Sequence, residues 1–440
     1  MEHHRAGRLA EADKIYRQVL VREPSHPDAL HLLGVIHAQR GQPETAVDLI
    51  SRALKVRPDV ADAHSNLGAA LTATGALDEA IASLQIALQL NPNLPGAHNN
   101  LGKALFNQGR ISEAIEAFSK AASLNPDDPK SHANLALAYL LLGDFPRGWR
   151  EHEWRLKIPA IVGGRQFSVP QWDGRNLDGQ TILLHPEQGF GDIIQFARFV
   201  PEVAARGGRV ILECPPELFR LFRGFPYVAQ LVQSGGPLPH FDVQCPLLSL
   251  AGVLNITAET IPCRVPYLRP DRELVQRWGE RFDAGDQRLR VGLAWAGRPN
   301  QVNNRNRSMG LPQFAPLASV ESIAFFSLQK GDAAAQAAQP PTGLRFVDWT
   351  ADLADFADTA AMIENLDLVL TVDTAVAHVA GAMGKRVWVL LPWIPDWRWM
   401  LERTDSPWYP SMRLFRQAKM GDWADVLQRV AASLQNEKRS

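Results

Sequence analysis

The chain has 440 residues, of which 46% are apolar and 21% are charged. That length predicts two to four domains, and the balance of 46 basic against 47 acidic residues argues against a nucleic-acid partner. The three cysteines, Cys214, Cys245 and Cys263, lie too far apart for a zinc ribbon, and their number is typical of a reducing compartment. The sequence begins with a charged helical pattern and contains no run of 18 apolar residues. We therefore expect a soluble, cytoplasmic protein without a membrane span.

Residues that end helices or let them approach recur every 34 positions in the first third of the chain. The prolines of this series are Pro24, Pro58, Pro92 and Pro126, and the glycines are Gly34, Gly68 and Gly102. Glycine lets two helices cross closely, and proline ends the second helix of each pair. The pattern resembles the tetratricopeptide repeat, with complete repeats at 27–60, 61–94 and 95–128 between a partial unit and a degenerate one.

Three asparagines, Asn66, Asn100 and Asn134, share one register on the first helix of each pair. On the concave face of a superhelix, such amides can hydrogen-bond the backbone of an extended peptide. The alternative, equally open, is that they satisfy neighbouring helix ends. We interpret the histidines aligned one repeat apart as packed residues rather than metal ligands: His64, His98 and His132.

The composition changes near residue 150, because all twelve tryptophans lie at or after Trp149. Glycine and proline then interrupt the sequence over 155–178, which predicts a linker. We predict four segments: repeats over 1–154, the linker 155–178, a first α/β domain over 179–285 and a second over 286–440.

Short apolar runs alternate with helical periods after the linker. The first half predicts strands at 181–185, 209–213, 229–232 and 241–245, with helices at 193–205 and from residue 216. The second half predicts strands at 289–295, 323–328, 344–347, 367–372 and 387–391, with helices at 356–366 and 375–383. This alternation predicts two mostly parallel sheets covered by helices, which are two Rossmann-like domains. The fold class is therefore α plus α/β.

A carboxylate follows the first strand of the first α/β domain. In the segment 185–192, Gly189 and Gly191 permit a tight turn, and Asp192 enters the next helix at its start. A carboxylate there faces the edge of the sheet where ligands bind in open α/β folds. It is a candidate general base, and the alternative is a residue that caps the helix.

A second candidate site lies where strand 367–372 meets the helix at 375–383. Asp373 ends the strand, Thr374 is placed as the N-cap, and His378 follows one helical turn later. The unpaired N–H groups of such a helix bind anions and suit a diphosphate. The alternative is a capped helix with one structural histidine.

Further polar and aromatic groups follow other strands. Arg305 and Arg307, in the loop 296–308 that also contains Arg298, can clamp phosphate or acceptor, although a solvated loop has the same composition. Lys330 is a candidate phosphate contact. Three tryptophans surround Asp396 and Arg398 in the segment 392–399, where they either contact a sugar ring or close the edge of the sheet.

The segments 189–192 and 373–378 resemble the two signatures of glycosyltransferase family 9, the heptosyltransferases, over roughly 181–417. The resemblance implies a GT-B fold of two Rossmann-like domains and metal-independent, inverting transfer from a nucleotide-sugar donor. It implies Asp192 as general base and Asp373, Thr374 and His378 as contacts of the donor phosphates. We also place Gly189, Gly191 and Asp396 on the donor side. No lysine stands at the family's phosphate position, so Arg305, Arg307 or Lys330 would replace it.

Tetratricopeptide repeats ahead of such a unit are similar to the O-GlcNAc transferases and to bacterial repeat-fused transferases that glycosylate flagellin. That resemblance implies a protein acceptor, with flagellin as one example, held through Asn66, Asn100 and Asn134. Our first hypothesis is an inverting glycosyltransferase acting on protein Ser or Thr, with a nucleotide sugar as donor, no metal and no cofactor. The alternatives are a saccharide or lipid-linked acceptor, or a non-catalytic assembly protein that binds a nucleotide sugar.

Overall fold

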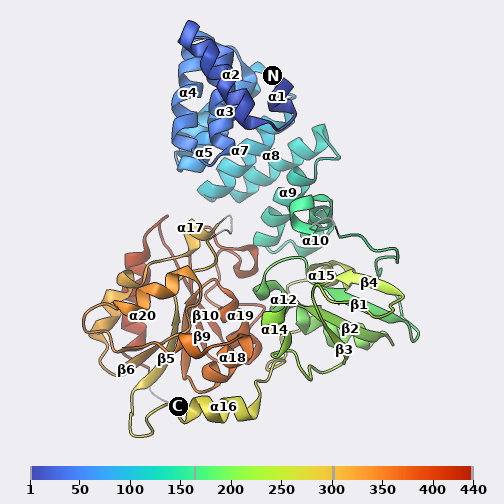
Figure 1. The fold of residues 1–440 in the computed structure, drawn as a ribbon, viewed down its shortest axis with the longest axis vertical. Coiled ribbons are helices and arrows are strands. Elements are labelled where there is room, and N and C mark those ends of the chain that lie inside the picture. The colour runs from blue at the N-terminus through green and yellow to red at the C-terminus, as the bar shows by residue number, and fades with distance from the viewer. Residues whose placement is uncertain (1, 163–164, 300–302, 438–440) are drawn as a thin grey trace. The chain divides into compact units, whose positions relative to one another are not determined.

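A computed structural model describes residues 2–162, 165–299 and 303–437. Residues 163–164 of the predicted linker and 300–302 of the arginine-containing loop lie outside the described residues. The chain divides into two compact units (Figure 1). The first comprises Met1–Leu142 with Glu151–Ile158, and the second comprises Gly143–Arg150 with Pro159–Ser440.

The first unit is a series of antiparallel helix pairs, which confirms the repeat prediction. Its helices are α1 (Glu2–Arg5), α2 (Leu9–Arg22), α3 (Pro27–Gln39), α4 (Pro43–Val56), α5 (Ala61–Thr74), α6 (Leu77–Leu90), α7 (Pro95–Gln108), α8 (Ile111–Leu124) and α9 (Pro129–Leu141). The short 3-10 helix η1 (Glu153–Lys157) packs on α9. Each pair is closed by apolar residues that recur at the 34-residue interval, such as Ala46, Ala80 and Ala114, all fully buried.

The repeating glycines of this unit serve two different physical needs. A Cβ atom on Gly68 would lie 2.4 Å from Cγ of Leu84, and one on Gly102 would lie 2.5 Å from the ring of Phe118, so these positions require close helix crossing. Gly75 and Gly109 end α5 and α7 with φ of 89° and 88°, a conformation that costs glycine little. The first series sets the crossing of each helix pair, and the second series ends its first helix.

The second unit contains two parallel sheets joined by helices. The first sheet has strands β1 (Thr181–His185), β2 (Arg209–Cys214), β3 (Val228–Gln233) and β4 (Val243–Pro246). The second has β5 (Leu289–Ala294), β6 (Ile323–Ser327), β7 (Phe346–Val347), β8 (Leu368–Val372), β9 (Val387–Leu391) and β10 (Met412–Arg416). The helices are α10 (Phe145–His152), which begins in this unit, α11 (Pro159–Val162), α12 (Phe190–Phe196), α13 (Val200–Ala204), α14 (Pro216–Phe219), α15 (Leu250–Val253), α16 (Arg272–Gly279), α17 (Asn304–Arg307), α18 (Phe356–Glu364), α19 (Ala375–Ala382) and α20 (Trp423–Leu434).

The strand order places one reversal point in each sheet. The first sheet has the order β3-β2-β1-β4, and the second has β10-β9-β8-β5-β6-β7. Counted along the chain, the second order is that of the doubly wound dinucleotide-binding fold. Ligands of such sheets bind where the order reverses, at the carboxyl ends of the strands. These points lie between β1 and β4 in the first sheet and between β5 and β8 in the second.

The structure departs from the predicted elements at several places after the linker. The predicted helix at 193–205 is three pieces, because α12 passes into the 3-10 helix η2 (Ala197–Phe199) and then into α13, where Pro201 has no N–H to donate. The strand β10 and the helix α20 were not predicted. The apolar face of α20, with Val426 and Val430 fully buried, closes the core of the second sheet.

Candidate functional site

The two predicted motifs meet within the second unit. The loop after β1 leads into α12, and β8 leads into α19; these two helices pack against each other (Figure 1). The start of α12, where Asp192 lies, therefore contacts α19 at His378, although the two helices follow strands of different sheets. This contact was expected from the idea of two facing domains and not from any local pattern.

Asp192 is the third residue of α12, and both of its carboxylate oxygens are engaged. Its Oδ2 accepts a hydrogen bond of 2.8 Å from the N–H of Gly189, and its Oδ1 forms an ion pair with Arg398. The alternative of an N-cap Asp is therefore wrong: Gly189 is the N-cap of α12, and Asp192 accepts from its N–H as the third residue of the helix. Burial raises the pKa of Asp192, and the charge of Asp396 adds to this, while Arg398 opposes it. A raised pKa suits a general base.

The tight-turn explanation for Gly189 and Gly191 is wrong. Gly189 has φ of −73°, and neither glycine is among the residues with positive φ. A Cβ on Gly191 would instead lie 2.7 Å from Cδ2 of His378, so glycine is required because α12 and α19 touch there. At Gly189 the same atom would meet only Asp192 Oδ2, at an ordinary 3.4 Å.

A polar face of α12 and η2 contacts the second sheet's loops, and the sequence analysis missed it. Gln195 Oε1 accepts a hydrogen bond from Arg398 Nε. Arg198, which is buried, donates to the carbonyl oxygen of Trp408 at 2.6 Å, and its guanidinium lies 4.5 Å from the ring centroid of Tyr409. Asp192, Gln195 and Arg198 follow one another at the three-residue spacing of a single helix face. That spacing is the sequence signal from which this polar face could have been predicted.

Two of the residues predicted for the donor side, Asp373 and Arg307, belong to a buried cluster of charges at the end of β8. Arg307 Nη1 lies 3.8 Å from Asp373 Oδ2, with only 12% and 11% of the two side chains exposed. Gly297 leaves room for that guanidinium, because a Cβ there would lie 2.4 Å from Arg307 Nη2. Burial, together with the charge of Asp396, raises the pKa of Asp373 to about 6, against the opposing charges of Arg307 and Arg398.

Thr374 and His378 occupy the start of α19 as predicted. The Thr374 hydroxyl lies 3.1 Å from that of Thr371 and makes no cap to the first turn of α19. His378 is buried, and its Nδ1 lies 2.9 Å from the hydroxyl of Tyr409. Burial lowers the pKa of His378 well below its usual value, and nearby arginines, Arg398 foremost, add to this. The ring is therefore neutral and packs where α19 meets α12; its contact with a donor phosphate stays a prediction.

The other predicted donor contacts differ in their exposure and in the hydrogen bonds that they already make. Arg305 is exposed on α17. Lys330 donates to the carbonyl oxygens of Thr350 and Leu353 at 2.8 and 3.0 Å, so it already ties down the loop after β7. Its phosphate contact stays a prediction. Asp396 accepts a 2.8 Å bond from Arg398 Nη1, which makes it a support for that arginine.

The tryptophan-rich segment 392–399 is mostly internal. Trp397 and Trp399 are buried, and Trp397 belongs to an aromatic cluster with Trp149, Phe196 and Trp408. Only Trp393 of the three is exposed, at 38%. Trp397 and Trp399 are therefore packed inside the fold, and a contact with a sugar ring stays a prediction.

The predicted asparagine ladder consists of hydrogen bonds between repeats. Asn66 Nδ2 lies 2.9 Å from His31 Nε2, and Asn100 and Asn134 donate to Ser65 and Asn99 at 3.2 and 2.9 Å. These contacts favour the structural alternative while leaving the three side chains half-exposed. The aligned histidines each reach the carbonyl oxygen of the proline six residues earlier, at 2.8 to 2.9 Å: His64, His98 and His132.

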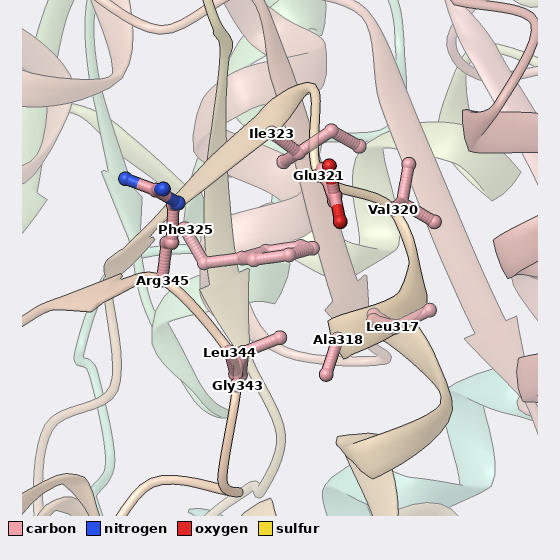
Figure 2. A pocket seen from close by; sticks show the side chains of 9 residues that line it. All are labelled: Leu317, Ala318, Val320, Glu321, Ile323, Phe325, Gly343, Leu344 and Arg345. Carbon is pink, nitrogen blue, oxygen red and sulfur yellow. The ribbon is translucent and has the colours of Figure 1, made fainter.

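A small hollow of about 30 Å³ lies away from the charged cluster. Figure 2 shows its lining, which includes the ring of Phe325, the apolar side chains of Leu317 and Ile323, and the charged Glu321 and Arg345. Its volume is below the roughly 300–1,000 Å³ of ordinary ligand pockets. Leu317, Ile323 and Phe325 belong to the core of the second sheet, and the hollow contains none of the predicted site residues.

Comparisons with known proteins bear on the first unit most directly. Models described as "TPR repeat" match residues 68–109 and 102–143, and a "Tetratricopeptide repeat" model matches residues 3–71. Residues 3–143 are tetratricopeptide repeats. Arrays of this kind present extended binding surfaces, which indicates protein partners.

One curated relative also extends into the second unit. The chain is 28% identical to protein FlbA of Caulobacter vibrioides over 325 residues, which is 68% of this chain and 54% of FlbA. The chain thus spans about half the length of this relative. Among solved structures, MamA of Desulfovibrio magneticus RS-1 is 23% identical, with a TM-score of 0.31, and covers 38% of this chain and 92% of its own. TTC0263, a tetratricopeptide-repeat protein of Thermus thermophilus, is 22% identical, with a TM-score of 0.32, over 36% and 86%.

Across the described ranges, no helix is both long and apolar enough to cross a membrane. In the same part of the chain, no group of three or more His, Cys, Asp or Glu side chains is arranged to hold a metal ion.

Proposed function

We propose that the second unit is an inverting glycosyltransferase that moves a sugar from a nucleotide-diphosphate donor to a hydroxyl acceptor without a metal ion. The observation that carries this proposal is the meeting of Asp192, from the first sheet, with Arg398, Asp373 and Arg307, from the second. A potential base and two cations converge where both sheets reverse their strand order. The strand order of the two sheets agrees with a GT-B arrangement.

The reaction assigns a step to each group. Asp192 takes the proton of the acceptor hydroxyl as that oxygen forms a bond to the anomeric carbon. The bond from that carbon to the diphosphate oxygen breaks on the opposite face, and its electron pair leaves with the nucleoside diphosphate. Arg307 and the first N–H groups of α19, which the Thr374 side chain does not cap, stabilise the departing charge.

The repeats supply the acceptor side of the proposal. We assign to them a protein whose Ser or Thr hydroxyl is modified, with flagellin among the candidates. The half-exposed side chains of Asn66, Asn100 and Asn134 each use an amide hydrogen between repeats, and their carbonyl oxygens suit the N–H groups of an extended peptide. A saccharide or lipid-linked acceptor remains the alternative of the same reaction class.

The test is turnover by the full chain with UDP-, GDP-, ADP- and CMP-sugars, measured as nucleotide release with and without a protein acceptor. Asp192→Asn is expected to lower turnover by about 10²–10⁴. The matched control is Asp425→Asn, whose partner Arg429 lies on the exposed face of α20, and it should turn over at the wild-type rate. Near-normal turnover by Asp192→Asn would remove Asp192 from the reaction. Binding of a nucleotide sugar without any turnover would favour the non-catalytic assembly protein.

A further inference from the structure

Arg398 has more partners than any other residue of the charged cluster. It lies on the 3-10 helix η7 (Trp397–Trp399), which follows β9, and 8% of its side chain is exposed. Its guanidinium donates in three directions: from Nη2 to Asp192, from Nε to Gln195 and from Nη1 to Asp396. Two of these partners belong to α12, so Arg398 links the first sheet's loop to the second sheet.

The contact with Arg398 weakens Asp192 as a base, because the guanidinium charge stabilises the ionised carboxylate. One carboxylate oxygen is held by Arg398 and the other by the N–H of Gly189. Each carboxylate oxygen keeps a further lone pair, but the oxygen paired with Arg398 attracts the proton of an acceptor hydroxyl less strongly. Loss of the contact with Arg398 would therefore make Asp192 a stronger base.

Arg398 keeps its charge and lies close to the proposed donor site. Burial opposes the charge, but the carboxylates of Asp396, Asp192 and Asp373 raise the pKa of Arg398 above its ordinary value. Asp373 immediately precedes Thr374 at the start of α19. A diphosphate bound there would bring two further negative charges within reach of a guanidinium, whose planar fork fits phosphate oxygens.

The backbone around Arg398 is fixed, so the change must be a rotation of its side chain. Arg416 donates to the carbonyl oxygens of Trp399, Met400 and Arg403, which immobilises the segment after η7. The backbone N–H of Arg398 is itself held by Asp396 Oδ1 at 3.1 Å.

We propose that Arg398 exchanges Asp192 for the donor's diphosphate, so that donor binding frees the base and stabilises the leaving group in one movement. This inference rests on the proposed function. It adds a catalytic residue, Arg398, and an order of events in which donor binding comes first and strengthens the base that deprotonates the acceptor hydroxyl.

The test is a double-mutant cycle on binding of nucleoside diphosphates, with UDP, GDP and ADP as probes and calorimetry of the full chain as the measurement. Asp192→Asn should tighten binding by about tenfold, because Arg398 no longer has to leave a charged partner. Arg398→Gln should weaken binding by about tenfold or more, and Arg398→Lys, which keeps the charge without the fork, should lie between it and wild type. In the Arg398→Gln background, Asp192→Asn should have no effect.

Three outcomes would contradict the exchange. Unchanged or weaker binding by Asp192→Asn, with a melting temperature like that of Asp425→Asn, would overturn the exchange and leave the proposed function standing. A gain that persists in the Arg398→Gln background would mean that removing negative charge alone strengthens binding, and would overturn it as well. Absence of binding in wild type and Asp192→Asn alike would overturn the proposed function and, with it, the exchange.

Discussion

At the scale of single residues, burial decides which groups of the charged cluster carry charge. His378 looked like a phosphate ligand because it follows Thr374 by one helical turn. In the structure it is buried among arginines, which together with desolvation keep its ring neutral. A neutral imidazole beside the Tyr409 hydroxyl adds no positive charge to a diphosphate site. The cations at the site are Arg307 and Arg398.

Asp373 illustrates the opposite shift and leads to a prediction on stability. Its pKa is raised from an ordinary 3.8 to about 6, chiefly by burial, so the folded chain binds this proton more tightly than the unfolded chain. Stability must then fall as pH rises from about 4 to about 6, and the loss is complete above that range. We expect Asp373→Asn to stabilise the second unit by about 1–3 kcal/mol at pH 8, since each pKa unit corresponds to about 1.4 kcal/mol.

The measurement is denaturant unfolding of the full chain at pH 4 and pH 8, following the transition of the second unit. The gain in the free energy of unfolding from Asp373→Asn should vanish at pH 4, where the wild-type Asp373 side chain is itself protonated. Asp425→Asn, on the exposed face of α20, should show no such gain. A stabilisation equal at both pH values would mean that charge burial is not its cause.

At the scale of elements, the packing of α12 on α19 holds the site together. Gly191 is the contact point, since a Cβ there would lie 2.7 Å from Cδ2 of His378. The ring of His378 cannot move aside easily, because it stacks on Trp399 with centroids 5.6 Å apart and reaches Tyr409 on its other side. The two helices can therefore approach this closely only where Gly191 faces His378.

We predict that Gly191→Ala destabilises the second unit by about 1–3 kcal/mol, the ordinary cost of overpacking. The control is Gly189→Ala, two positions earlier, where the added Cβ meets only an ordinary contact and φ already suits alanine. Thermal unfolding of both variants is the measurement. If both lose equal stability, close approach to His378 does not explain Gly191.

At the scale of the whole molecule, the change of composition and the boundary between the units do not coincide. The repeats were predicted to extend to residue 154, yet Gly143–Arg150 belongs to the second unit. The reason is aromatic packing: Phe145 and Trp149 are buried, and the indole N–H of Trp149 donates to the carbonyl oxygen of Ile256 at 2.8 Å. Part of the second helix of the degenerate last repeat, within Gly143–Arg150, therefore packs in the second unit.

This boundary predicts how truncations behave. A chain of residues 129–440 should keep the unfolding temperature of the second unit, whereas 159–440 should unfold at a clearly lower temperature. Loss of a buried Phe or Trp side chain costs about 3–5 kcal/mol. Trp149→Ala in the longer chain should reproduce much of that decrease. Equal melting temperatures for the two truncated chains would show that the aromatic contacts add little to the second unit.

The sequence by itself determined what depends on local spacing. The 34-residue interval predicted the helix pairs, and alternating apolar runs predicted most strands to within a residue or two, because helix ends and buried strands are set by neighbouring residues. It also placed Asp192 and Asp373 correctly at the carboxyl ends of strands. The edge strand β10 was not predicted, because its exposed Arg413 interrupts the apolar run.

Only the tertiary structure decided which of these residues meet. Arg398 and Asp192 are 206 residues apart, and no local pattern links them. Their contact exists because α12 and the segment after β9 pack against each other, which depends on the strand order of both sheets. The same packing gives Gly191 a role that the sequence had assigned to a turn, and it makes His378 neutral. Burial and charge pairing arise from long-range contacts, so the state of the proposed base could be seen only in the folded chain.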